Sequence, residues 1–507
     1  MTSKAQLRVS DEPFAAARAT FDRIVDWLRS DDVPQTEAGI ERAISERGRE
    51  LQRQLLEARC DVLHARECAE LNRTGAPEGI EIRARKRHME TEFGRIRLWR
   101  NGWKNDGEAR SRFPLDEQLN LPKELYSHPL RQRVADEARI GAWEQAVERI
   151  DRSTAAHVPK RQAEEQTIQA AQDLEAFYER HLLPANDTLS ARALLCMSSD
   201  AKGVSMRPEA LRDATRKAGE AERAEAVRGD PMAPKKLRKH DKRMAVVTAV
   251  WQQEPYQRSA KDILDNLNSR PQPSTKRRKK ARKTRTPRPQ NKRLSASVQK
   301  SQAQGIAEMF DEAERRDPEH QRVAVVLVDG EEHQLEEIRR QAQQRRWGLT
   351  IVIDLIHVLH YLWMAANALC NKQPKQTQKL VVHFVTKLLT GRVCDVIGAL
   401  RQTATRRELS PDAHQTVEKC ANYLYKNAWF LRYPEFLRQG FPIATGVIEG
   451  ACRHLVQDRL GITGARWGLA GAEAILKLRA IHSNGDWDDY WQFHEQREAE
   501  RNYTLAA

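Results

Sequence analysis

The chain has 507 residues, too long for one compact core, and this length predicts two to four domains. Its 86 Lys and Arg against 71 Asp and Glu give a formal net charge of +15. Because Lys and Arg neutralise phosphates of any sequence, this excess favours nucleic acid as partner over a membrane surface. No apolar run approaches the ~20 residues of a membrane span, and the N-terminus lacks the apolar segment of a signal peptide. We therefore expect a cytoplasmic protein without a membrane partner.

The seven cysteines are scattered and form no Cys-x-x-Cys pair. A disulfide scaffold is therefore not expected in so large a chain, and neither is a zinc ribbon. We interpret most of these cysteines as small buried apolar residues.

Residues 1–115 are predicted to form an N-terminal helical region with a small basic β-hairpin. Apolar residues at helical spacing predict helix from residue 12 to about residue 70, as either a helical hairpin or a coiled-coil contact. Two strands are expected around the turn at Gly94. Their alternating Arg and Lys either line a DNA backbone or form a solvated basic face.

Residues 116–185 are predicted to form short helices with a break near Gly141 and another over residues 153–159. Lys160 and Arg161 would open the helix after the second break, as in a helix-turn-helix that binds DNA. Any three-helix bundle has a similar pattern, so both interpretations stay open.

Residues 186–355 have a different pattern from the helical segments before them. Four β-rich runs, at 191–200, 243–251, 323–330 and 349–354, alternate with helical segments, which predicts an α/β sheet. Three of the runs end in an aspartate: Asp200, Asp329 and Asp354. Residues 201–208 are expected to form the hairpin partner of the first run.

A basic disordered linker over residues 266–296 is predicted to interrupt this part. Residues 270–293 hold twelve Lys or Arg, four Pro and no acid, so they cannot bury a core. The segment is either a solvated linker or, as we favour, a nucleic-acid contact. Its candidate DNA-binding residues are Lys276, Arg277, Arg278, Lys279, Lys280, Arg282 and Lys283.

Residues 356–440 are predicted to be a helical insertion, and residues 441–507 to complete the α/β core and carry a C-terminal tail. A helix that begins near Thr445 or Gly446 would place Glu449 in its first turns.

The aspartates at the strand ends and Glu449 are considered together here because they can share one site. Aspartates at the ends of neighbouring strands point into one crevice at the edge of a sheet, and Glu449 could pack beside them. Such carboxylates repel one another unless hard cations such as Mg²⁺ or Mn²⁺ share them. Two such ions ~4 Å apart can drive cleavage and transfer of a phosphodiester.

Four segments resemble the catalytic core of bacterial insertion-sequence transposases: SSDAKG (198–203), VLVDG (326–330), IVIDLIH (351–357) and GVIEGACRH (446–454). The particular family is the Kra-type one, which is distantly related to the Mutator-like transposases. Residues 121–165 also resemble the N-terminal half of that family. The likeness covers most of the chain from residue 80 to residue 500, except the basic linker.

The resemblance implies a ribonuclease-H-like α/β fold whose DDE triad holds two Mg²⁺ or Mn²⁺ ions. When the family's motifs are matched to this chain, the triad corresponds to Asp200, Asp329 and Glu449. Asp354 and His357 match a D-x-x-H element that we interpret as support for the site. An alternative makes Asp354 the second catalytic acid; we prefer Asp329, which directly follows a strand and precedes a glycine. Ala201 departs from the glycine more usual in the family.

Two arginines follow Glu449 closely. Arg453, one turn further along the helix, either holds a DNA phosphate or pairs with Glu449 or another triad acid. Arg466 is a further candidate DNA contact. Trp467 and Trp487 are interpreted as core aromatics.

The sequence thus predicts a DDE transposase with a ribonuclease-H-like core, an all-helical insertion and a mainly α-helical N-terminal DNA-binding region. Its partners would be the inverted repeats of its element, target DNA and a second copy of the chain. The alternatives are a regulator that binds DNA without chemistry, and a structure-selective nuclease. A bacterial transposase would be associated with the nucleoid.

Overall fold

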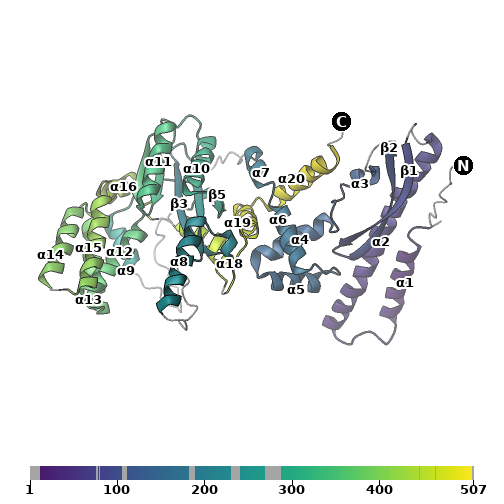
Figure 1. Cartoon of the computed structure of the whole chain (residues 1–507), viewed down its shortest axis with the longest axis horizontal. Helices are drawn as coiled ribbons and strands as arrows, with labels where there is room; N and C mark the ends of the chain where they lie inside the picture. The colour runs from purple at the N-terminus through teal and green to yellow at the C-terminus, as the bar shows by residue number, and fades with distance from the viewer. Residues whose placement is uncertain are drawn as a thin grey trace. The chain divides into compact units, whose positions relative to one another are not determined.

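The computed structural model describes residues 12–75, 78, 80–105, 111–181, 189–229, 240–268, 287–407, 409–444, 446–462 and 464–504. It divides into two compact units (Figure 1). Unit 1 comprises Met1–His181 and Gly485–Ala507, and unit 2 comprises Leu182–Asn484. No helix in the described part is long and apolar enough to cross a membrane. All seven cysteines are free, and six of them are buried.

Unit 1 begins with two helices and a two-stranded sheet. Helices α1 (Ala15–Arg29) and α2 (Glu37–Thr74) pack on each other, and the Thr36 side chain caps α2. Strands β1 (Ile80–Thr91) and β2 (Gly94–Asn105) pair antiparallel around Gly94, as predicted. Their small core contains Cys60, Met89, Ile96, Leu98 and Leu121. The predicted apolar stripe of α1 is only partly covered, because Phe21 is 55% exposed and Leu28 41%.

Short helices follow, again as predicted: α3 (Pro114–Gln118), α4 (His128–Ile140), α5 (Trp143–Ser153), α6 (Lys160–Ala170) and α7 (Leu174–Arg180). Helices α4, α5 and α6 share one apolar core built around Leu130, Val134 and Ile150. The predicted break after residue 153 is real, and Lys160 is the first residue of α6.

The C-terminal helix α20 (Trp487–Ala499), in the predicted C-terminal tail, belongs to unit 1, whereas the segment that carries Glu449 belongs to unit 2. The physical reason is a buried set of charges. Arg131 on α4, fully buried, donates two hydrogen bonds to the Glu498 carboxylate, at 2.5 and 2.7 Å. His494 and Arg501 both bond the Asp173 carboxylate, at 2.7 and 2.6 Å.

Unit 2 contains a five-stranded sheet with the order β5-β4-β3-β6-β7. Strand β3 (Leu194–Ser205) pairs antiparallel with β4 (Lys242–Gln253), which pairs antiparallel with β5 (Gln290–Ser297). On its other side β3 pairs in parallel with β6 (Ala324–Val328), and β6 in parallel with β7 (Leu349–Ile353). The mixed α/β character predicted for this region is confirmed.

Two details of the predicted sheet are wrong. Residues 201–205 are not a hairpin partner but the continuation of β3, because β4 stays in register with β3 as far as the pair Ser205↔Lys242. Asp200 therefore lies inside a strand and not at its end. In addition, residues 290–296 of the predicted linker belong to β5, where Leu294 and Ala296 are buried against the rest of unit 2.

Helices cover the sheet and extend from it. They are α8 (Asp213–Gly229), α9 (Ala260–Asn268), α10 (Gln302–Arg316) and α11 (Glu332–Gln344). The predicted helical insertion contains α12 (Leu355–Leu369), α13 (Pro374–Leu389), α14 (Val393–Arg406), α15 (Pro411–Lys426), the 3₁₀ turn η2 (Ala428–Phe430) and α16 (Tyr433–Gln439) (Figure 1).

The last segment of unit 2 carries Glu449. It contains α17 (Gly446–Ala451), the π-helical turn η3 (Cys452–Gln457), α18 (Asp458–Leu460) and α19 (Leu469–Asn484). Ile448, Ala451 and Leu455 of this segment are buried. Trp467 is also buried, as predicted, and the Arg459 guanidinium lies 4.6 Å from its ring centre.

Candidate active site

The sheet brings Asp200 and Asp329 to the same level. The parallel pairing of β3 with β6 runs from Leu195↔Ala324 to Ser198↔Leu327. Asp200 and Asp329 each lie two residues further along their strand direction. There β6 has ended while β3 continues, so the edge of β3 becomes free beside Asp200.

The Asp200 carboxylate is held by three neighbours. The backbone N–H of Ala201 donates to Oδ1 at 2.6 Å, while the Cys452 thiol donates to Oδ2 at 3.2 Å. The Lys202 ammonium lies 3.2 Å from the same Oδ2. With its side chain 12% exposed, Asp200 is a largely buried anion with an internal countercharge.

The surroundings of the Asp329 carboxyl disfavour its ionised form. Burial raises its pKa, and the negative charge of Asp200 raises it further. The Glu331 backbone N–H, which donates to Oδ1 at 2.9 Å, and the nearby His357 act in the opposite direction without cancelling the rise. A shared cation would relieve the effect of the Asp200 charge on Asp329.

Helix α15 fixes the backbone of this loop. The Tyr423 hydroxyl donates to the Asp329 carbonyl at 2.6 Å. Gly330 has a φ of +86°, and a Cβ there would lie 2.9 Å from the amide nitrogen of Asn427. The glycine after Asp329 is therefore required both by its backbone conformation and by the close approach of α15.

Asp354 has a structural role at the end of the next strand. It is the N-cap of α12, its carboxylate accepts from the Ile356 N–H at 2.7 Å, and it is 3% exposed. Its own N–H donates to the Val328 carbonyl at 2.8 Å. His357 follows on the first turn of α12, close enough to act on the charge of Asp329. The structure thus groups Asp329 with Asp200 and uses Asp354 as a helix cap.

Glu449 lies on α17, which packs on β3 and β4. Its side chain is exposed, and its charge reaches the site. Burial opposes the charged form of Lys202, but Asp200, Cys452 and Glu449 outweigh burial and raise the Lys202 pKa. Two of the three predicted acids, Asp200 and Glu449, therefore act on one lysine.

These residues match a hard divalent cation in donor chemistry, since all three acids offer carboxylate oxygens. As the side chains lie, no group of three or more His, Cys, Asp or Glu among the described residues is assembled to hold a metal ion. Lys202 takes the place of a cation at Asp200. Binding of Mg²⁺ would require this ammonium to move and Glu449 to turn toward the two aspartates.

Sequence reasoning missed the contacts of Lys202 and Cys452. The signal for Lys202 was present, because residues two apart on a strand share one face of the sheet. Cys452 had no such signal, because the π-helical turn η3 that begins at this residue has no pattern in the sequence.

The candidate DNA contacts lie in separate places. Lys160 and Arg161 are exposed on α6 but pair with Glu144 and Glu165. Arg453 pairs with Asp458 at 3.5 Å, so the ion pair predicted with a triad acid is replaced by one with a different acid.

Arg466 lines a small groove of about 290 Å³ together with Gly203 and Lys242. The seven basic candidates at 276–283 lie outside the described residues.

Neither a protein-family model nor a curated protein matches this chain.

Proposed function

We propose that the chain is a DDE transposase that cuts and joins DNA at the ends of its own element. The observation that carries the proposal is the meeting of Asp200 and Asp329 at one level of neighbouring parallel strands, with Glu449 on a helix packed against the same sheet. The strand order β5-β4-β3-β6-β7, antiparallel on one side of β3 and parallel on the other, supports a ribonuclease-H-like core.

The chain's own residues define the chemistry. Asp200, Asp329 and Glu449 would hold Mg²⁺ or Mn²⁺, which when bound supplies Lewis acidity to a water or 3′-hydroxyl nucleophile and to the departing oxygen. Tyr423 and Asn427 keep the Asp329 backbone in place while the carboxyl changes its partners. Lys202, once released from Asp200, is positioned to meet a phosphate oxygen of the DNA.

Basic residues outside this site fit the same substrate. The net charge of +15 supplies general affinity for DNA, and the three-helix cluster of α4, α5 and α6 supports a helix-turn-helix that recognises the element ends.

The test is a strand-transfer assay on labelled DNA that carries the inverted repeats flanking the coding sequence, with Mg²⁺ present. Wild type and Asp354→Asn should join strands, because asparagine caps a helix about as well as aspartate. Asp329→Asn should bind the repeats but not join them. Joining by Asp329→Asn, or a loss of joining only in Asp354→Asn, would remove Asp329 from the site.

A DNA-binding regulator without chemistry is the second candidate. The Lys202–Asp200 ion pair favours it, since an internal cation can stabilise the acids permanently. Tight binding to the repeats by wild type, without cleavage in Mg²⁺ or Mn²⁺, would select this function.

A further inference from the structure

The end of α15 has one side fixed to the candidate site. Tyr423 and Asn427, one helical turn apart, contact Asp329 and Gly330. The Tyr423 ring also stacks on Tyr361 of α12 at 4.0 Å between ring centres. Any ligand on the other side of this helix end therefore lies about one helix diameter, ~10 Å, from the candidate acid.

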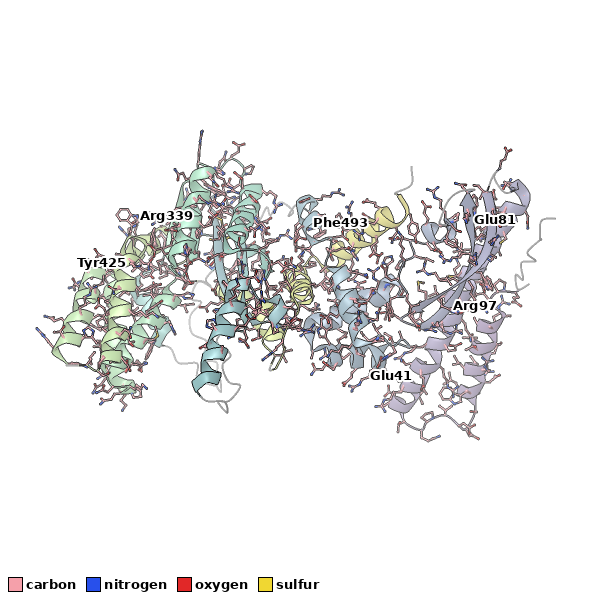
Figure 2. The ribbon with its side chains drawn as sticks, in the orientation of Figure 1. Glu41, Glu81, Arg97, Arg339, Tyr425 and Phe493 are labelled. Atoms are coloured by element: carbon pink, nitrogen blue, oxygen red, sulfur yellow. The ribbon has the colours of Figure 1, made fainter. Side chains whose placement is uncertain are left out.

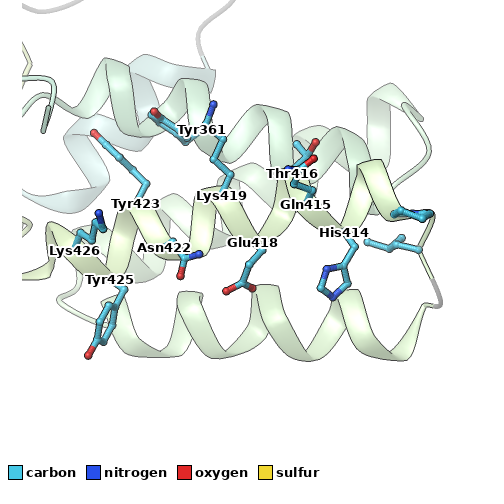
Figure 3. Close-up of a pocket in the computed structure, with 12 residues that line it drawn as sticks. Tyr361, His414, Gln415, Thr416, Glu418, Lys419, Asn422, Tyr423, Tyr425 and Lys426 are labelled. Atoms are coloured by element: carbon cyan, nitrogen blue, oxygen red, sulfur yellow. The ribbon is translucent and has the colours of Figure 1, made fainter. Parts of the chain in front are cut away.

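The end of α15 and the turn η2 that follows it carry two exposed rings. Tyr425 and Trp429 are also four residues apart, and they are 68% and 73% exposed, more than any other large hydrophobic residue in the described part of the chain. Figure 3 shows Tyr423 and Tyr425 leaving α15 in opposite directions, and Figure 2 shows Tyr425 on the outside of unit 2. Exposed rings of this size cost free energy in water unless a partner covers them.

The charges around these rings favour an anionic partner. Lys419 and Lys426 are exposed on α15. Lys426 pairs with Glu332 at 3.5 Å, whereas Lys419 has no acidic partner within the described residues. The nearby Glu418 is neutralised by Arg401 at 3.0 Å. The Arg432 guanidinium lies 5.2 Å from the Trp429 ring centre, where it can stack together with the ring, and it pairs with Glu435 at 3.2 Å.

Of the two rings, Tyr425 also borders an open groove. Its volume is about 1520 Å³, and its lining includes Tyr361, His414, Lys419, Tyr425 and Lys426 (Figure 3). The groove has aromatic faces and amines side by side, the combination that binds single-stranded nucleic acid through stacked bases and neutralised phosphates.

We propose that Tyr425 and Trp429 form a stacking surface for unpaired bases of single-stranded DNA, about one helix diameter from Asp329. The inference rests on the proposed function and deepens it: the strand opened at an element end would be held here. Duplex DNA cannot use the rings in this way, because its bases are already stacked on one another.

The test measures fluorescence anisotropy of a labelled oligothymidine, and of a duplex of the same length, in EDTA. Tyr425→Ala/Trp429→Ala should bind the oligothymidine at least about tenfold more weakly than wild type, since each stacked base contributes about 1–3 kcal/mol. Its duplex affinity should change by less than about twofold, because phosphate contacts remain. Tyr425→Phe/Trp429→Phe keeps the rings and should retain most of the affinity.

The matched control is Phe21→Ala, which removes a 55% exposed ring from α1 in unit 1 and should leave oligothymidine binding unchanged. Unchanged single-strand binding by the double alanine variant would overturn the proposal, as would an equal loss for strand and duplex. So would a wild-type dimer that the variant dissociates in sedimentation while single-strand affinity persists, because the rings would then be an interface between copies.

The proposed function and the stacking surface are tested by different variants. Asp329→Asn should bind oligothymidine like wild type in EDTA but should not carry out strand transfer, and this result tests the role of the acids. Tyr425→Ala/Trp429→Ala should lose single-strand binding while it stays folded, and that result tests the role of the rings.

Discussion

Replacement of Arg131 by methionine tests the buried charges that join α20 to the rest of unit 1. Arg131 has a side chain only 1% exposed and bonds a Glu498 side chain that is 7% exposed. Removal of one partner of a buried pair costs about 3–5 kcal/mol, because the other charge stays buried without compensation. Here Arg501 at 3.9 Å and His494 at 3.6 Å offset part of that cost. We therefore expect the lower end, about 3 kcal/mol.

Scanning calorimetry of the full chain measures the effect. For a unit of roughly 200 residues, each kcal/mol lowers Tm by about 2–4 °C, so the unit 1 transition should fall by about 6–12 °C. The control is Arg152→Met on α5, whose pair with Glu148 is 78% and 63% exposed. An exposed pair of this type contributes about 0.5 kcal/mol or less. If Arg131→Met lowered Tm no more than Arg152→Met, the buried pair would not hold α20 and the reasoning would be wrong.

Two further predictions concern the pH dependence of stability and the backbone conformation at Gly330. Burial opposes ionisation of Asp173 and Glu498, but hydrogen bonds from His494, Arg501 and Arg131 outweigh it and lower both pKa values. Their contribution to stability is therefore complete above the ordinary carboxyl pKa and is lost as pH falls through the lowered values. Urea unfolding between pH 6 and pH 2 should show the free energy of unfolding falling at acid pH, and Glu498→Gln should reduce that fall. Gly330→Ala should cost about 1–2 kcal/mol in chemical denaturation, because alanine must adopt a left-handed conformation against Asn427. Gly348→Ala, with open space and an ordinary φ, should stay within about 0.5 kcal/mol, and equal costs would contradict the role assigned to Gly330.

Local patterns predicted much of this fold. The turn at Gly94, the strands before Asp329 and Asp354, and the helix that begins at Gly446 all follow from runs and breakers within a few residues. Each of these elements carries its signal in its own sequence, through apolar runs, glycines or caps.

The errors arose where pairing over long distances decides structure. Residues 201–205 were predicted to fold back as the hairpin partner of the run before them, yet pairing with β4 keeps them in β3. Residues 290–296 look like linker because Lys292 and Arg293 continue a basic run, yet they add an edge strand to β4.

At the candidate site, the sequence supplied the acids and not their partners. The alignment of Asp200 with Asp329 depends on the parallel register of β3 and β6, which no local pattern encodes. The cap formed by Asp354 could have been anticipated, since aspartate directly before an apolar helix is a common N-cap.

The division of unit 1 into two chain segments sets an order of events during synthesis. The ribosome delivers Glu498 and His494 only after the roughly 300 residues of unit 2, a delay of about 15–60 s at about 5–20 residues per second. During that time Arg131 and Asp173 have no C-terminal partners, and the sequence of unit 2 is complete before that of unit 1. A chain interrupted before Gly485 would keep the three candidate acids in a folded unit 2 but leave unit 1 incomplete.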